Sequence, residues 1–292
     1  MCSVTNTTSW LAIVPSASWD PIHRVPLFAL DRARSCDGSS RLHPRELTAL
    51  KWLRFRKGKD TMKQIFLLVA LGLSLVGAHA DDPGFVTPQQ VDASILLPPP
   101  PVPGSPRAVA EMAELKQIAA SRTREAFAAA ARDATDETGD VFSDALGPAF
   151  DLTKLPATAK MLHDIHMEEE TLSKPAKEFF HRDRPWVSDP SLETCTAHKT
   201  GRAQNSYPSG HATGAYAMGV ILASLIPGKA QQILARSSEF SENRLVCGMH
   251  FRSDIVAGQT LGTIIATDLL NNSQFREEYN AAASELSAQH LR

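Results

Sequence analysis

Three separated segments of the chain carry basic, imidazole and carboxylate side chains at short spacings. The residues are Lys177 and Arg184 in the first segment, Ser209, Gly210 and His211 in the second, and Arg244, His250 and Asp254 in the third. A guanidinium group binds the oxygens of an oxyanion through a planar fork, and a lysine ammonium adds a point charge. Combined with two imidazoles and a carboxylate, these cations indicate a site that binds an anion and moves protons around it.

The second segment is a turn that opens an apolar helix. In the run Pro208-Ser209-Gly210, the first N–H groups of the helix lack an intrahelical partner, and the helix dipole favours an anion there. Ser209 adds a hydroxyl donor, and Gly210 lets the backbone approach a ligand closely. Taken alone the pattern is weak, because a serine at a helix start is more often an ordinary cap.

His250 and Asp254 in the third segment are four residues apart, so we expect them on one face of the same helix. The carboxylate can then accept the Nδ1 proton of the ring and leave Nε2 free as a nucleophile or base. The alternative is a surface pair that contributes a few tenths of a kcal/mol.

The order of these three segments carries more information than any one of them. The pattern Lys177-x6-Arg184-Pro185, Pro208-Ser209-Gly210-His211 and Arg244-x5-His250-x3-Asp254 resembles the signature of the acid phosphatase and vanadium haloperoxidase superfamily, which has the phosphatidic-acid phosphatase type 2 (PAP2) fold. Within it, the chain is most similar to the bacterial class A non-specific acid phosphatases. The features similar to that class are Leu-Leu-Pro-Pro-Pro-Pro at 96–101, Ser206-Tyr207 and Val246-Cys247-Gly248.

The resemblance implies a histidine mechanism that uses no metal or other cofactor. His250 would attack phosphorus to form a phosphohistidine, while Asp254 orients its ring and His211 protonates the leaving oxygen and later activates water. The groups that would hold the phosphate oxygens are Lys177, Arg184, Ser209, Gly210 and Arg244. The resemblance also implies small phosphate monoesters of broad range as substrates, a homo-oligomer, and an acidic pH optimum if His211 must start protonated.

Three positions depart from the family pattern or vary within it. Asn243 stands before the arginine of the third segment, where the family usually has serine. An amide can also hydrogen-bond near a phosphate, so we expect tuning of the site and not its loss. Met249, where related chains often carry an aromatic residue, and the basic Arg252 are expected to alter the rim of the pocket.

A second, weaker pattern concerns metals. His163 and His166 are three residues apart and precede Glu168, Glu169 and Glu170, and an i, i+3 pair on a helix can chelate. No recognisable spacing completes a set of ligands, so we interpret this stretch as a solvated helix face.

Residues 62–80 have the three parts of a secretory signal peptide. A short cationic start is followed by an apolar run from Ile65 to Val76 and by the small-x-small site Ala78-His79-Ala80. We therefore expect export, cleavage after Ala80 and a periplasmic or secreted protein, although an internal helix or an uncut anchor would share this pattern. Residues 1–61 precede the signal and are interpreted as an over-extended start or a long leader, so the catalytic domain is 81–292.

Charge and cysteine usage narrow the function of that domain. Residues 81–292 carry 19 Lys and Arg against 27 Asp and Glu, which argues against nucleic-acid binding. Cys195 and Cys247 can form one disulfide in an oxidising compartment, but the sequence leaves their distance open.

The elements expected in 81–292 are all helical, because no stretch alternates with period two and β-branched residues are sparse. The expected helices span 105 or 106 to 131, 141–149, 151–169, 171–181, 211–225, 229–248 and 250–271. Gly and Ala in the 211–225 and 250–271 helices would let these two approach closely as the buried centre. An extended proline-rich arm precedes them, and the fold expected is one compact bundle.

Two other functions fit parts of this pattern. A vanadate-dependent haloperoxidase would use the same anion site around vanadate, and a non-catalytic phosphate-binding protein would need the cations but not the two histidines and the aspartate. A membrane lipid phosphatase is disfavoured because 81–292 lacks several apolar spans of about 20 residues.

Overall fold

The computed structural model describes residues 84–292, which belong to the second of two units of the chain, Ser74–Arg292. The predicted leader 1–61 and signal peptide 62–80 lie outside the described residues. The helices are α2 (Ala93–Leu96), α3 (Pro106–Ser121), α4 (Arg124–Asp133), α5 (Ser143–Leu146), α6 (Pro156–Phe180), α7 (Pro185–Ser188), α8 (Gly210–Leu225), α9 (Ala230–Val246), α10 (Arg252–Asn271) and α11 (Phe275–Ala288). Short 3-10 turns η1 (Gly139–Phe142), η2 (Leu152–Lys154) and η3 (Pro227–Lys229) join some of them. No strand occurs within 84–292, which confirms the all-α prediction.

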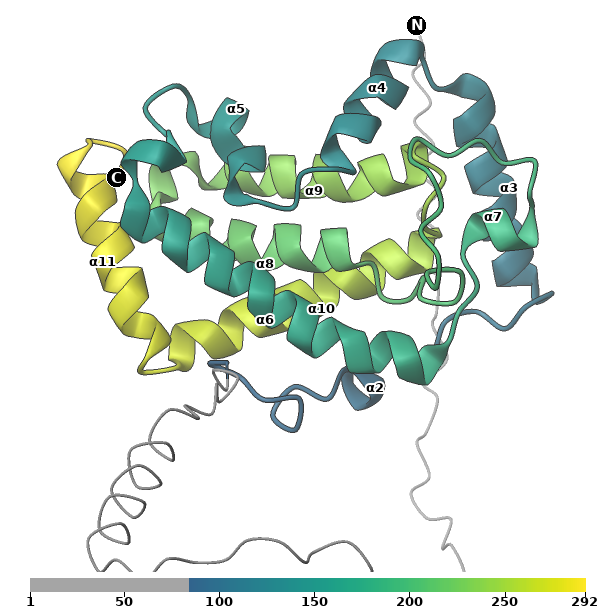
Figure 1. The fold of residues 1–292 in the computed structure, drawn as a ribbon, viewed down its shortest axis with the longest axis horizontal. Coiled ribbons are helices and arrows are strands. Elements are labelled where there is room, and N and C mark those ends of the chain that lie inside the picture. Colours follow the sequence, from purple (N-terminus) through teal and green to yellow (C-terminus); the bar gives the residue numbers. More distant parts are fainter. Residues whose placement is uncertain (1–83) are drawn as a thin grey trace, which may run out of the picture. The chain divides into compact units, whose positions relative to one another are not determined.

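The buried centre is the pair α8 and α10, with α6, α9 and α11 around it (Figure 1). The two helices are in close contact where glycines of α10 face α8. A Cβ on Gly258 would lie 2.5 Å from the carbonyl oxygen of Ser209, and one on Gly262 would lie 2.2 Å from that of Thr213. The predicted close approach of these two helices is confirmed.

Helix α6 runs unbroken over 25 residues, so the prediction of two helices at 151–169 and 171–181 was wrong. Pro156 is at the first helical position, where its missing N–H is no loss. Pro175 lies inside the helix, and the buried apolar side chains on both sides of it keep the helix packed along its length. The helix ends at His181, which has a left-handed φ of 49°.

The single long helix expected up to residue 131 is instead two helices, α3 and α4. They are separated by Arg122, whose backbone is extended, and by Thr123, whose side chain accepts a hydrogen bond from the N–H of Ala126. The Arg122 guanidinium pairs with Glu193 at 2.7 Å and lies over the ring of Phe127. A side-chain cap and long-range partners therefore end α3 where helix propensity alone would continue it.

Two smaller expectations are corrected. The predicted helix 141–149 is a 3-10 turn followed by the four residues of α5, which stops at Gly147, where φ is +90°. The proline-rich arm is extended as predicted, but one helical turn, α2, interrupts it. The Tyr207 hydroxyl donates to the carbonyl of Pro98, so the arm is tied to the segment that leads into α8.

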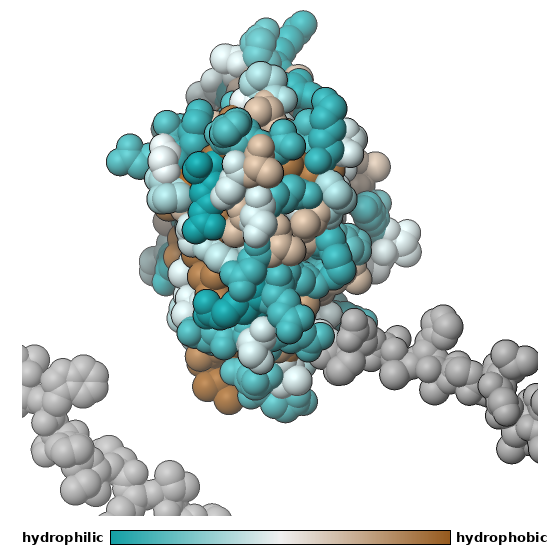
Figure 2. Space-filling view, turned by 90° about the vertical axis from the view of Figure 1, so that its left-hand side faces the viewer, coloured by the Kyte–Doolittle hydropathy of each residue, from teal (hydrophilic) through white to brown (hydrophobic). Residues whose placement is uncertain are grey.

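Within residues 84–292 no helix is both long and apolar enough to cross a lipid bilayer. The face on the α11 side of Figure 1 is largely hydrophilic, with hydrophobic residues in small groups (Figure 2).

Candidate active site

His250 lies just before α10, which begins at Arg252 with Phe251 as its N-cap. The prediction that His250 and Asp254 share a helix face was therefore wrong in detail, because Asp254 is in the first turn and His250 is outside the helix. The two are nevertheless brought together. His250 Nδ1 lies 2.8 Å from the Ser206 carbonyl oxygen and 3.3 Å from Asp254 Oδ2. Both partners are acceptors, so the proton of a neutral His250 ring is on Nδ1.

The opposite ring nitrogen of His250 is aimed at a cation. Nε2 lies 2.8 Å from Nη1 of Arg184, and an arginine can only donate, so Nε2 presents a lone pair. Burial lowers the pKa of His250 well below its usual value, and Arg184, Arg244 and Lys177 lower it further. The ring is therefore neutral, which is the form a nucleophile requires.

Asp254 is completely buried and bound from several sides. Its Oδ2 accepts from the Ser206 hydroxyl at 2.6 Å and from the Phe251 N–H at 2.8 Å, and Arg182 binds its Oδ1. Burial raises the pKa of Asp254, while Arg182 and Ser206 lower it. The Arg182 guanidinium also pairs with Glu111 of α3 at 2.7 Å. Asp254 therefore belongs to a chain of buried charges and not to an exposed pair.

Arg184 and Arg244 are both buried near His250 but differ in their partners. Arg184 donates to the side-chain oxygen of Asn205 from Nε and from Nη2, both at 3.1 Å, and to the carbonyl of Met249 at 3.0 Å. Arg244 is 3% exposed, and its Nε and Nη1 have no hydrogen-bond partner. Burial lowers the pKa of both guanidinium groups, yet arginine stays charged in the acidic and neutral range. Donors buried without acceptors point to an oxyanion ligand.

The central turn opens α8 as expected, and Ser209 makes the ordinary N-cap contact that the sequence offered as an alternative. Ser209 is the N-cap of α8, and its Oγ lies 3.4 Å from the N–H of Ala212. Lys177 Nζ donates to the carbonyl of Pro208 at 2.8 Å and would lie 3.5 Å from a Cβ on Gly210. Burial lowers the pKa of Lys177 to about 8. The lysine of α6 is therefore held against the mouth of α8.

His211 is in the first turn of α8 and contacts a carboxylate that sequence reasoning missed. Its Nδ1 lies 2.8 Å from Oε1 of Glu137, and its ring stacks on Phe240 of α9. Burial and Arg244 lower the pKa of His211 to about 4, although Glu137 raises it, and the same contact lowers the pKa of Glu137 to about 2. Glu137 lies in the short loop between α4 and η1, where no spacing links it to the other segments.

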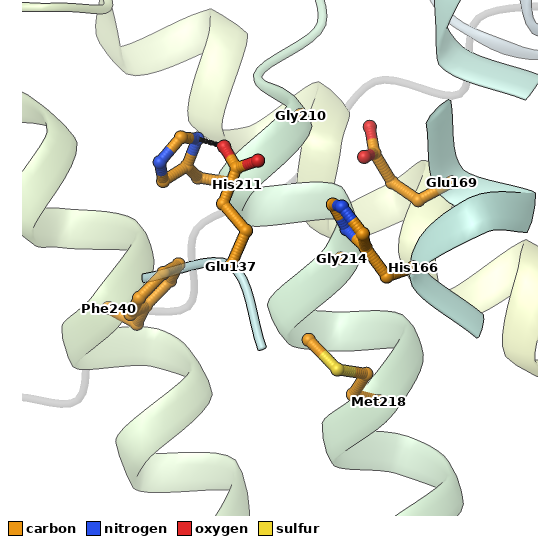
Figure 3. Close-up of a pocket in the computed structure, with 8 residues that line it drawn as sticks. All are labelled: Glu137, His166, Glu169, Gly210, His211, Gly214, Met218 and Phe240. Atoms are coloured by element: carbon orange, nitrogen blue, oxygen red, sulfur yellow. Dashed lines mark ion pairs between the residues drawn. The ribbon is translucent and has the colours of Figure 1, made fainter. Parts of the chain in front are cut away.

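A pocket of small volume adjoins His211, and Figure 3 shows the side chains around it. It is lined by Glu137, His166, Glu169, Gly210, His211, Gly214, Met218 and Phe240. The structure therefore separates the two histidines that the sequence grouped on α6. His163 is exposed, as expected for a solvated face, whereas His166 is partly buried in this lining.

The three positions that depart from the family pattern have structural partners. The Asn243 amide donates to Asp133 at 2.7 Å. Arg252 pairs with Glu114 at 2.7 Å and also with Glu242, so the expectation that it lies at the pocket rim is replaced by a role in joining α3, α9 and α10. Met249 is buried beside Trp186 and Cys247. None of the three side chains is in the lining of the pocket at His211.

Cys195 and Cys247 form a disulfide, and the N–H of Cys195 donates to the carbonyl of Cys247 at 3.1 Å. This resolves the alternative that the sequence left open. The bridge joins the loop after α7 to the segment that carries His250.

Several known proteins are similar to this chain in sequence. The profile of the PAP2 superfamily matches residues 167–277, which include all the predicted site residues. An acid phosphatase from Zymomonas mobilis is 32% identical over 228 residues, covering 75% of this chain and 86% of that protein. A non-specific acid phosphatase from Providencia stuartii is 29% identical over 205 residues, covering 68% and 82%. Among solved structures, a transmembrane PAP2 type phosphatidylglycerolphosphate phosphatase from Bacillus subtilis matches with a TM-score of 0.45 and 14% identity, covering 64% of this chain and 92% of that one.

Proposed function

Since this chain belongs to the PAP2 superfamily and is an acid phosphatase, we propose that it hydrolyses phosphate monoesters through a covalent phosphohistidine on His250. The observation that carries the proposal is the neutral, buried His250, with its Nε2 lone pair exposed to a set of buried cations. A lone pair facing cations is suited to attack the phosphorus of an anion that those cations bind.

In the first step, Nε2 of His250 attacks phosphorus and the bond from phosphorus to the leaving oxygen breaks. Arg184 Nη1, which binds Nε2 in the free enzyme, would shift its hydrogen bond to a phosphate oxygen. The leaving oxygen takes a proton from His211. The ring of His250 becomes cationic, and its Nδ1 proton remains held by Ser206 and Asp254.

In the second step, water attacks the phosphohistidine from the side where the leaving group departed. His211, now neutral, accepts a proton from that water, a new oxygen–phosphorus bond forms and the Nε2–phosphorus bond breaks. Inorganic phosphate leaves, and His211 is again protonated. Because the pKa of His211 is lowered to about 4, the acid form that the first step needs is populated at acidic pH, and this supports an acidic optimum.

The cations would stabilise the negative charge on the equatorial phosphate oxygens in both steps. The ammonium of Lys177 lies against the turn that begins α8, and Arg244, whose Nε and Nη1 find no acceptor among the described residues, acts electrostatically on His211 in that turn. The N–H of Gly210 would add a donor. Such preorganised donors act strongly where water is excluded. No step needs a metal ion, and a site that recognises mainly the phosphate supports broad specificity for the leaving group.

The test is hydrolysis of a chromogenic phosphate monoester by the purified protein across pH, in EDTA, beside His250→Ala. Activity that peaks at acidic pH, survives EDTA and is lost in the variant is the expected result. A wild-type protein that binds phosphate or vanadate but hydrolyses nothing would instead favour the haloperoxidase or the binding protein.

We also propose that the enzyme is periplasmic or secreted. The signal-peptide pattern at 62–80 and the disulfide between Cys195 and Cys247 support this, since disulfides persist in oxidising compartments. Mass spectrometry of exported protein is expected to find Asp81 as the first residue. Peptides from 1–61 in the precursor would refute the over-extended start.

A further inference from the structure

Beside the pocket at His211, three side chains from two segments converge. One potential ligand atom each from Glu137, His166 and Glu170 lies within 4.8 Å of the other two. His166 and Glu170 are one turn apart on α6, a spacing that places both on one face. Glu137 reaches them from the loop between α4 and η1, and Figure 3 shows its carboxylate between His211 and His166.

We propose that Glu137, His166 and Glu170 bind one divalent transition-metal ion, and that the bound ion takes the Glu137 carboxylate away from His211. One imidazole and two carboxylates form a ligand set that suits Zn²⁺, which takes nitrogen and oxygen ligands at a site of three protein groups and water. Phosphate hydrolysis as proposed above does not use this ion, so the site is an additional one.

A separate observation in the same pocket also indicates a cation. Glu169, the neighbour of Glu170 on α6, is 5% exposed and lines this pocket, and its Oε1 has no hydrogen-bond partner. Buried carboxylate oxygens are rarely left without a donor. A dication held by Glu137 and His166 would share this pocket with the unpartnered carboxylate oxygen of Glu169.

The link to His211 follows from the shared carboxylate. Oε1 of Glu137 is 2.8 Å from Nδ1 of His211, while Glu137 also belongs to the ligand cluster. A carboxylate pulled toward an ion at His166 and Glu170 can no longer hold the imidazole in its present position. We therefore expect the ion to inhibit hydrolysis from beside the phosphate site, and chelation to restore the rate.

The experiment is calorimetric titration of Zn²⁺ into the chelator-treated, purified protein at pH 7, because binding is then read without any activity. The expected result is one specific equivalent of Zn²⁺, with affinity at least about tenfold weaker in His166→Gln. His163→Gln is the matched control, since it removes an exposed imidazole one turn earlier on α6 that is outside the cluster. It is expected to bind as the wild type does.

Two results would overturn the proposal. Wild-type protein that takes up no Zn²⁺, or equal affinities for His166→Gln and His163→Gln, would show that the cluster is not a site. In a parallel rate assay, Zn²⁺ is expected to inhibit the wild type at concentrations at which His166→Gln keeps its activity. Equal inhibition of both would refute the link to His211. Failure of the proposed phosphatase function would be seen separately, because the wild-type protein would then be inactive in EDTA.

Discussion

The disulfide between Cys195 and Cys247 leads to a stability prediction whose size follows from the chain it closes. The two cysteines are 52 residues apart in sequence. The entropy that such a cross-link removes from the unfolded chain corresponds to about 4 kcal/mol at 25 °C. For a domain of this size, about 4 kcal/mol shifts the melting temperature by roughly 8–16 °C. The double variant Cys195→Ala/Cys247→Ala should therefore unfold at a clearly lower temperature than the oxidised wild type.

Alanine is the appropriate replacement because Cys247 is completely buried, and a serine there would add the cost of burying a hydroxyl group. Urea unfolding of the double variant, the oxidised wild type and the wild type in reductant would measure the free energies of unfolding. The last two samples have the same sequence and differ only in the bridge. Equal unfolding midpoints for all three would refute the reasoning, because the cross-link would then contribute nothing measurable.

Three further predictions concern packing and charge. Gly262→Ala places a Cβ 2.2 Å from a backbone oxygen of α8 and should lower the free energy of unfolding by about 1–3 kcal/mol or more, measured by urea titration. In the control variant Gly228→Ala, the added Cβ meets no described atom within 4 Å, so the free energy of unfolding should change little. Because burial lowers the pKa of Lys177 to about 8, its ammonium loses its proton as pH rises through that value. Phosphate affinity measured by calorimetry should fall above about pH 8 in the wild type but not in Lys177→Arg. Arg182→Ala leaves Asp254 buried without its cation and should cost about 3–5 kcal/mol at neutral pH. The loss should shrink in acid, where protonation removes the uncompensated charge, and a loss independent of pH would show that packing dominates.

The candidate site residues that the sequence grouped, and that the structure brings together, share one property. Each lies in a short motif whose residue types indicate a chemical role, so the spacing of Lys177 from Arg184 or of His250 from Asp254 was informative without coordinates. The helix pair at the centre was predictable for a similar reason, because small residues repeated along α8 and α10 let the two backbones approach closely. Local patterns therefore predicted the buried centre of the fold and selected residues that the structure brings together at the candidate site.

Helix boundaries were less predictable, because tertiary contacts decided them. Sequence propensity favours one helix through Arg122, yet this side chain binds Glu193, which is far along the chain. Conversely, Pro175 suggests a weak point in α6, but apolar contacts on both sides keep the helix continuous. In both cases the competing interaction involves residues that a local window does not contain.

The supporting residues around the site were missed for a further physical reason. Arg182, Ser206 and Glu137 are common residue types, and the sequence around them does not predict the direction of their side chains. Arg182 and Arg184 are two residues apart, yet one guanidinium binds Asp254 and Glu111 while the other binds Asn205 and faces His250. The chain leaves α6 through the left-handed His181, and Arg184 is the N-cap of α7, so the helix period does not predict where either guanidinium points, and the partners of both come from other segments.

The partners of these side chains also show how a domain of net negative charge holds a cationic site. Burial lowers the pKa of His250, and Arg184, Arg244 and Lys177 lower it further, while two buried carboxylates lie near this group of cations. Asp254 forms an ion pair with Arg182 on the Nδ1 side of His250, and Glu169 lies beside Lys177. Among the residues that the structure describes, Nε and Nη1 of Arg244 have no hydrogen-bond partner. The donors of Arg244 are therefore left to an anion, and under the proposed mechanism this arrangement would let one site bind phosphate beside an uncharged His250.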